Sequence, residues 1–189
     1  MSARYVSFEE LSPVLEWLAC QRPESRYAHF SLFRVGFDNP HVLGSTFGAS
    51  DAMRRLNQFG NMLAATVRRA DLVARDLTVF WILTSECNAD IVGCRLCEIV
   101  SGVQNFGLEV VDSSVGVYLF PLKDVNLARA GTRKIIDRLQ AMPPHFKFDP
   151  AHDCAVSWMT RTGNKVEDWR GRIRQNCYRV RAEFPPAGA

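Results

Sequence analysis

The chain has 189 residues, of which 47% are hydrophobic and 23% are charged, and its formal net charge is +3. This composition is typical of a globular protein and excludes an intrinsically disordered chain. A single core of this size needs neither disulfides nor metal ions to fold. The net charge is too small for a protein that binds nucleic acid through its overall charge, so nucleic acid is not an expected partner.

The sequence also makes predictions about location. No window reaches the roughly 18 consecutive apolar residues of a membrane span. Glu9 and Glu10 precede any apolar run, which is not the pattern of a signal peptide. We therefore expect a cytoplasmic protein without a membrane span, in which the cysteines are mostly reduced.

The first predicted elements are a capped helix and a strand. Ser7 and Glu10 have the spacing of a capping box, which predicts a helix over 8–20. Residues 28–37, AHFSLFRVGF, are rich in aromatic and other strand-forming side chains, which predicts a strand. The next segment, 38–49, is rich in glycine, proline and asparagine and is predicted to be a loop.

The middle of the chain predicts two helices around a hairpin. Apolar residues recur at helical spacing from Ser50 or Asp51 to about Arg69. Strands are predicted over 72–75 and 79–84, joined by a tight turn, and a second helix over 89–103.

The last elements complete an alternating order. Residues 108–120 are predicted to form strand, 124–142 a helix, and 154–158 a final strand after Pro143 and Pro144. The resulting order α-β-α-β-β-α-β-α-β predicts an α+β fold, with a mostly antiparallel central sheet flanked by helices.

A motif in the middle of the chain carries a family resemblance. Leu56, Leu63 and Val67 lie along the predicted helix, and the run RRADLVAR occupies residues 68–75 at its end. This pattern resembles the GGDEF domain family, which contains the diguanylate cyclases and their inactive relatives. The resemblance implies a nucleotidyl-cyclase-like palm over residues 27–142, with an N-terminal helix at 1–26. A basic C-terminal extension over 143–189 is then expected to pack on the same domain.

The hairpin departs from the pattern of an active cyclase. The family has two glycines and an acidic pair there, whereas this chain has Asp76-Leu77-Thr78-Val79 before Phe80 and is one residue shorter. The family's other metal aspartate would fall near Val35 and Gly36, and the nearby Asp38 is one displaced acid. Two-metal phosphoryl chemistry needs several oxygen ligands. We therefore expect no cyclase activity, no catalytic residue, no metal site and no cofactor.

The motif that remains is R-x-x-D, with Arg68 and Asp71. The resemblance implies that this is the product-inhibition site, where cyclic di-GMP binds. The residue types suit the ligand, since arginine presents a fork of donors to phosphate or to the guanine O6/N7 edge and aspartate accepts from guanine N–H groups. The family adds a second arginine at a position occupied here by Glu98, and Arg95 could substitute for it.

These residues lead to three functional hypotheses. The first is a non-catalytic cyclic di-GMP receptor that regulates a protein partner, with a homodimer as a further expectation. The second is a ligand-free interaction module, in which Arg68 and Asp71 form an ordinary surface ion pair. The third is an enzyme with altered chemistry. Family analogy places the first hypothesis in bacterial signalling that controls surface polysaccharide (biofilm) or motility.

Two further patterns give weaker indications. Cys94 and Cys97 form a C-x-x-C pair, but no second pair follows at the spacing of a zinc site, so buried cysteines are the simpler interpretation. Residues 161–183 hold seven basic and three acidic side chains, a charge of +4 that leaves −1 on the rest of the chain. This basic segment is expected to be either a solvated face or a contact for an acidic partner or a nucleotide's phosphates.

Overall fold

The structure is a computed structural model, and it describes part of the chain. The described residues are 5–21, 30–85, 89–120, 130–142, 144, 146–149 and 155–158. The basic segment at 161–183 lies outside them. No helix among these residues is long and apolar enough to cross a membrane.

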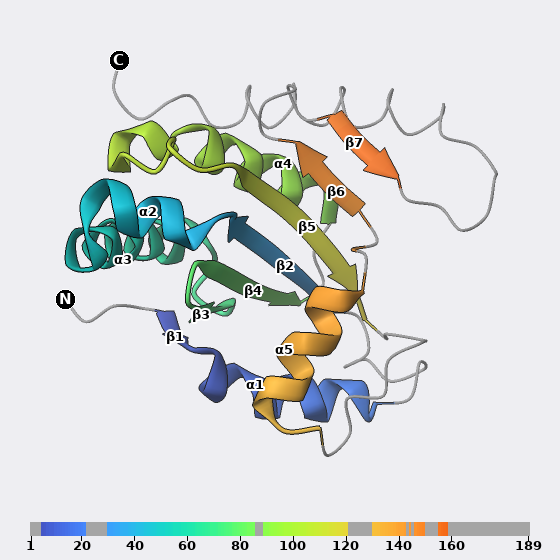
Figure 1. Cartoon of the computed structure of the whole chain (residues 1–189). Coiled ribbons are helices and arrows are strands. Elements are labelled where there is room, and N and C mark those ends of the chain that lie inside the picture. The colour runs from blue at the N-terminus through green and yellow to red at the C-terminus, as the bar shows by residue number, and fades with distance from the viewer. Residues whose placement is uncertain are drawn as a thin grey trace.

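A seven-stranded sheet runs through the described residues, in the order β1-β3-β4-β2-β5-β6-β7 (Figure 1). The strands are β1 (Tyr5–Ser7), β2 (Phe30–Phe37), β3 (Leu72–Asp76), β4 (Val79–Ser85), β5 (Ser113–Leu119), β6 (Phe146–Asp149) and β7 (Ala155–Trp158). β1 pairs with β3 in parallel, and the other described pairings are antiparallel. The predicted α+β class with a mostly antiparallel sheet is confirmed.

Helices cover both faces of the sheet. They are α1 (Phe8–Ala19), α2 (Pro40–Phe47), α3 (Ala49–Thr66), α4 (Ala89–Ser101) and α5 (Thr132–Ala141), with a short 3₁₀ helix, η1 (Val103–Phe106). Figure 1 shows α1 beside α5, and α2 beside α3. The capping box expected at α1 is confirmed, and in it the Glu10 carboxylate accepts a hydrogen bond of 2.9 Å from the Ser7 backbone N–H.

Alternation along β2 separates two cores. Phe33 and Val35 pack on one face with α3 and α4, whereas Leu32 packs on the other face with α1 and α5. The helices pack apolar residues against each face of the sheet, because residues three and four apart lie on one face of a helix. On the first face these include Leu56, Phe59, Leu63, Leu96 and Val100. On the second they include Leu11, Leu15, Leu18, Ile135 and Leu139.

The structure corrects several sequence predictions. The segment 38–49 is not a loop, because α2 occupies most of it. Its composition suggested a loop, but Pro40 stands in the first turn of the helix, where proline is favoured, and Leu43 is buried in the core. Residues 108–111 are not strand, and β5 begins at Ser113.

Two short strands were not predicted. β1 has three residues and β6 has four, which is too short for an alternating pattern to be recognised. β1 and α1 pack on the same sheet as the rest of the fold, and β6 and β7 extend that sheet beyond residue 142. The predicted boundaries at 26 and 142 stay predictions. The start of the predicted 124–142 helix lies partly outside the described residues, and α5 itself begins at Thr132.

Candidate functional site

The R-x-x-D motif forms a tight turn between α3 and β3. α3 ends at Thr66, and Val67 already has an extended backbone. The Asp71 backbone N–H donates to the Arg68 carbonyl at 3.0 Å, and the Asp71 Oδ2 accepts from the Arg68 backbone N–H, also at 3.0 Å. These two bonds fix the turn, because a side-chain acceptor replaces the helix partner that the Arg68 N–H has lost.

The two side chains of this turn are not paired with each other. Arg68 is exposed and Asp71 is half-buried. The ion pairs among the described residues join Asp51 to Arg54 and Arg55, and Arg133 to Asp137, so none of them involves the turn. Burial raises the pKa of the Asp71 carboxyl, although the Arg68 backbone N–H and the Arg68 charge act in the opposite direction. Within the described part of the chain, the turn therefore presents a guanidinium and one carboxylate oxygen without a hydrogen bond.

Arg95 lies on α4, which begins at the same end of the sheet as the turn. Leu72, directly after the turn, is opposite Leu83 on β4, and α4 follows β4 with Ala89 as its first residue. Arg95 is exposed in the middle of this helix, about 9 Å along the axis from its start at 1.5 Å per residue. The structure places Arg68 and Asp71 in one turn, but no contact given for the described residues joins either of them to Arg95.

The hairpin between β3 and β4 has a leucine at its tip. Leu77 has a φ of 51° and is 69% exposed. This left-handed conformation is unfavourable for a residue with a Cβ, and glycine is the residue that usually adopts it. The hairpin therefore keeps the backbone geometry that suits glycine but carries a bulky apolar side chain.

Arg75 fastens this hairpin tip to α3. Its Nε donates to the Leu77 carbonyl at 2.6 Å, its Nη1 donates to the Asn57 Oδ1, and its Nη2 lies 2.7 Å from the Met53 Sδ. Its guanidinium carbon also lies 5.7 Å from the centre of the Phe80 ring. Sequence reasoning placed Arg75 in the motif without this role, because its partners on α3, Asn57 and Met53, lie 18 and 22 residues away.

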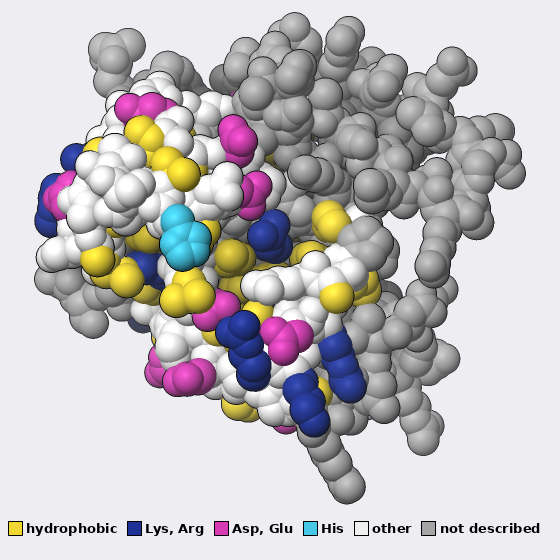
Figure 2. Space-filling model, viewed as in Figure 1, with side chains coloured by type: hydrophobic (Ala, Val, Ile, Leu, Met, Phe, Trp, Pro, Cys, Tyr) yellow, Lys and Arg dark blue, Asp and Glu magenta, His cyan; other side chains and the backbone are white. Residues whose placement is uncertain are grey.

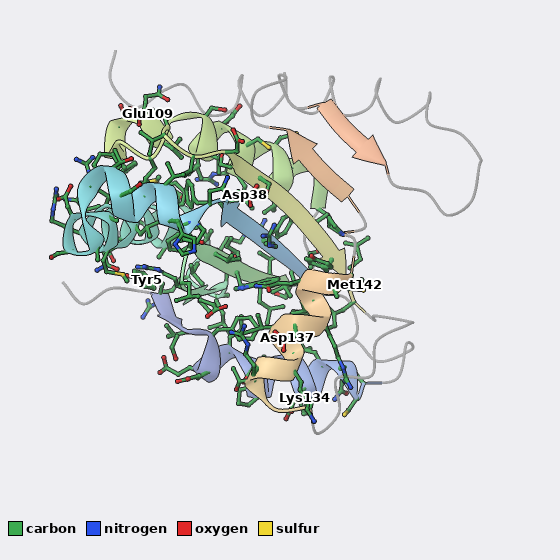
Figure 3. The ribbon with its side chains drawn as sticks, viewed as in Figure 1. Tyr5, Asp38, Glu109, Lys134, Asp137 and Met142 are labelled. Atoms are coloured by element: carbon green, nitrogen blue, oxygen red, sulfur yellow. The ribbon has the colours of Figure 1, made fainter. Side chains whose placement is uncertain are left out.

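The end of β2 lies beside the hairpin tip. Val35 is in the core and Asp38, labelled in Figure 3, is exposed at the end of the strand. The Asp38 backbone N–H donates to the Asp112 carbonyl at 2.8 Å. Among the residues that the structure describes, no three His, Cys, Asp or Glu side chains gather as a metal site would require. Cys94 and Cys97 are buried on α4.

Arg55 is a second structural arginine that sequence reasoning missed. Its Nε donates to Asp51 at 2.7 Å, its Nη1 donates to the Phe106 carbonyl at 2.7 Å, and its guanidinium carbon lies 4.1 Å from the centre of the Phe47 ring. It thus ties α2, α3 and η1 together. Hydrogen bonds from Arg55 and then Arg54 lower the pKa of the Asp51 carboxyl.

Comparison with solved structures identifies the fold as that of a GGDEF domain. The coiled coil and GGDEF domain of DgcB from Caulobacter crescentus has a TM-score of 0.53 at 15% identity, covering 74% of this chain and 74% of that one. The GGDEF domain of PA1120 (YfiN or TpbB) from Pseudomonas aeruginosa has a TM-score of 0.51 at 14% identity, with 74% and 94% covered. A microbial GGDEF domain studied with cyclic di-GMP has a TM-score of 0.52 at 14% identity, with 74% and 88% covered.

These comparisons confirm the GGDEF-like fold expected from residues 56–80. No protein-family model matches the chain, and no curated protein matches it in sequence. Identities this low establish a shared fold, and a fold supports many functions. The function has to be argued from the residues themselves.

Proposed function

We propose that this protein is a non-catalytic receptor for cyclic di-GMP, which binds the dinucleotide through Arg68 and Asp71 and regulates a protein partner. The single observation that carries the proposal is the turn itself. Hydrogen bonds with the Arg68 backbone fix the turn and the half-buried Asp71 carboxylate, the Arg68 side chain is exposed, and neither side chain forms an ion pair among the described residues.

The chemistry of the turn suits a guanine nucleotide. The Arg68 guanidinium can donate two parallel hydrogen bonds to a phosphate or to the O6 and N7 atoms of guanine. The Asp71 carboxylate keeps one oxygen for the guanine N1 and N2 donors, because the Arg68 backbone N–H occupies the other. A carboxylate that is already fixed loses little conformational entropy when the ligand binds.

Two of the structural neighbours support this ligand. The GGDEF and coiled-coil structure of DgcB was determined in complex with cyclic di-GMP, and the microbial GGDEF domain was described for its interaction with the same dinucleotide. These facts concern those proteins. They support the proposal for this chain because it shares the GGDEF-like fold of those two proteins.

The proposal includes loss of cyclase activity. The hairpin carries Asp76, Leu77 and Thr78 in place of glycines and an acidic pair, and β2 carries Val35 and Gly36 where a metal carboxylate was expected. Asp38 is exposed nearby, but one carboxylate does not hold two cations. Incubation with GTP and Mg²⁺ should therefore give no product above background.

The cellular setting follows from the same proposal. We place the protein in bacterial cytoplasmic signalling that controls biofilm polysaccharide or motility, where a homodimer is a further expectation. The proposed readout is a change in affinity for the partner when cyclic di-GMP occupies the turn.

Calorimetric titration with cyclic di-GMP tests the binding claim. Arg68→Ala should weaken binding by roughly ten- to a hundredfold, because a hydrogen bond to a charged group is worth about 1.5–3 kcal/mol. Asp71→Asn should have a similar effect. Arg69→Ala is the matched control, since Arg69 is an exposed arginine on the same turn but outside the R-x-x-D pattern. Arg95→Ala shows whether the third residue takes part.

A ligand-free interaction module is the second candidate. Glu98 stands where the family has its second arginine, and Leu77 is strongly exposed at the hairpin tip. The absence of binding heat at high cyclic di-GMP concentration would favour this candidate over the receptor.

A further inference from the structure

Arg34 is a cation in the middle of the sheet, away from the R-x-x-D turn. It lies on β2, opposite Trp81 on β4 and Gly116 on β5. Because Phe33 and Val35 face α3 and α4, strand alternation places Arg34 on the face that α1 and α5 cover.

The Arg34 guanidinium lies over Gly36, two residues further along β2. A Cβ atom at Gly36 would be 2.9 Å from the Arg34 Nη2 and 3.0 Å from its Cζ. The Arg34 Nη1 donates to the Ser114 Oγ at 3.3 Å, and Ser114 is opposite Gly36 on β5. The missing side chain at Gly36 therefore creates the space in which the guanidinium is held.

The positive charge at this place has no ion-pair partner among the described residues. The Arg34 Nε is buried without a hydrogen-bond partner, and so is the Nε1 of the fully buried Trp81. None of the ion pairs among the described residues involves Arg34, although Asp38 ends the same strand. The charge also acts on Tyr118. Burial raises the pKa of the Tyr118 hydroxyl, and the Arg34 charge offsets part of this increase.

The outer part of the guanidinium remains accessible. Arg34 is only partly buried, and its Nη2 is neither buried nor hydrogen-bonded within the described part of the chain. Figure 2 shows a hollow between α2 and α5 that contains hydrophobic and basic side chains, with acidic side chains at its edge. A half-buried, unpaired cation is unfavourable until an anion or a hydrogen-bond acceptor joins it.

We propose that Arg34 and Ser114 form an anion site that takes a phosphate group directly, without a divalent cation. The planar fork of the guanidinium matches two phosphate oxygens. The Ser114 hydroxyl accepts from the Nη1, so its own proton is available to a third oxygen. A fixed arginine also repels Mg²⁺, so phosphate binding here should not need the metal.

This site is separate from the proposed cyclic di-GMP site. Gly36 is opposite Val79, beside the hairpin tip, whereas Leu72 and the R-x-x-D turn lie at the other end of the same strands, near Leu83. Failure of one site therefore leaves the other untouched, and variants at each can be compared in the same protein.

The test is titration of the full chain with inorganic pyrophosphate in EDTA, followed by calorimetry and by the indole N–H signals in NMR spectra. We expect pyrophosphate binding to shift the indole N–H signal of Trp81, which is assigned by its absence in Trp81→Phe. The affinity should be unchanged when Mg²⁺ replaces EDTA. Arg34→Met should weaken binding at least about tenfold, as expected for the loss of a charge-assisted hydrogen bond. Ser114→Ala should weaken it to a smaller extent.

Arg133→Met is the control, because Arg133 is exposed on α5 and its loss removes the same charge. This variant should bind pyrophosphate like the wild type. No binding by the wild type, equal binding by Arg34→Met, or a requirement for Mg²⁺ would each overturn the proposal. Stronger binding of malonate than of pyrophosphate would assign the site to carboxylates and overturn the phosphate assignment.

Discussion

Gly60 on α3 marks the closest approach of a helix to the sheet. A Cβ atom at this position would lie 2.6 Å from the Cε1 of Phe80 and 3.1 Å from the Cε1 of Tyr5, where ordinary contact begins at 3.4 Å. Phe80 is fully buried and cannot easily move aside, since its ring packs edge-on against Phe59 at 5.3 Å and Phe37 at 6.4 Å. Gly60→Ala should therefore force the helix and sheet apart.

The size of this effect follows from two opposing contributions. Overpacking a buried site costs about 1–3 kcal/mol, and replacing a helical glycine by alanine returns about 1 kcal/mol. Gly60→Ala should thus destabilise the fold by roughly 1 kcal/mol. Gly44→Ala on α2 is the matched control, because a Cβ there meets nothing within 4 Å. It should stabilise the fold by about 0.5–1 kcal/mol.

Thermal unfolding of the two variants measures the difference. About 2 kcal/mol between them corresponds to a separation of roughly 4–8 °C in Tm for a chain of this size. Gly60→Ala melting at or above Gly44→Ala would refute the packing of α3 against β4 described above.

Other substitutions probe the hairpin, the α3 ion pairs and the turn. Leu77→Gly should raise the free energy of unfolding by up to about 1 kcal/mol, because it relieves a left-handed leucine; Leu77→Ala keeps that backbone and should give no such gain in denaturant titration. Arg54 and Arg55 lower the pKa of Asp51, so its ionised form stabilises the fold above the ordinary value of 3.8, and this stability is lost as the pH falls through the folded-state pKa. The advantage of wild type over Asp51→Asn should therefore shrink in denaturation curves below pH 3.8; a constant difference would contradict the pairing. Burial raises the pKa of Asp71, so cyclic di-GMP binding should weaken on acidification at a higher pH than for an exposed aspartate, and Asp71→Asn should lack this step.

Strong periodicity made the central elements predictable. On α3, Leu56, Phe59 and Leu63 recur at helical spacing and are buried in one core. The two strands of the hairpin are apolar runs separated by a short turn. The RRADLVAR motif, at the end of α3 and in β3, gave the family resemblance. These local signals were enough to indicate the GGDEF-like fold.

The missed elements depend on contacts that are distant in sequence. β1 is a three-residue strand that exists because β3 offers it a parallel edge, with Val6 opposite Ala74. α2 is short, and its Pro40 and Gly44 are residues typical of loops. The helix could not be predicted because the burial of Leu43 in the core depends on the tertiary structure. Tertiary context overrides weak local preferences in both places.

The two candidate sites also differ in whether they depend on local sequence or on contacts distant in sequence. Arg68 and Asp71 were found because three residues of spacing are visible in a sequence. The isolation of Arg34 was not visible, because it depends on Trp81 and Ser114 from two neighbouring strands and on the absence of a side chain at Gly36.

The ratio of the cyclic di-GMP dissociation constants of Arg68→Ala and Arg69→Ala tests the receptor proposal most directly. Both variants remove one exposed arginine from the same turn, so their effects on net charge are equal. We predict that Arg69→Ala binds like the wild type and that Arg68→Ala binds roughly ten- to a hundredfold more weakly. Equal affinities for the two variants, or no binding heat from the wild type, would contradict the proposal that the R-x-x-D turn is a cyclic di-GMP receptor.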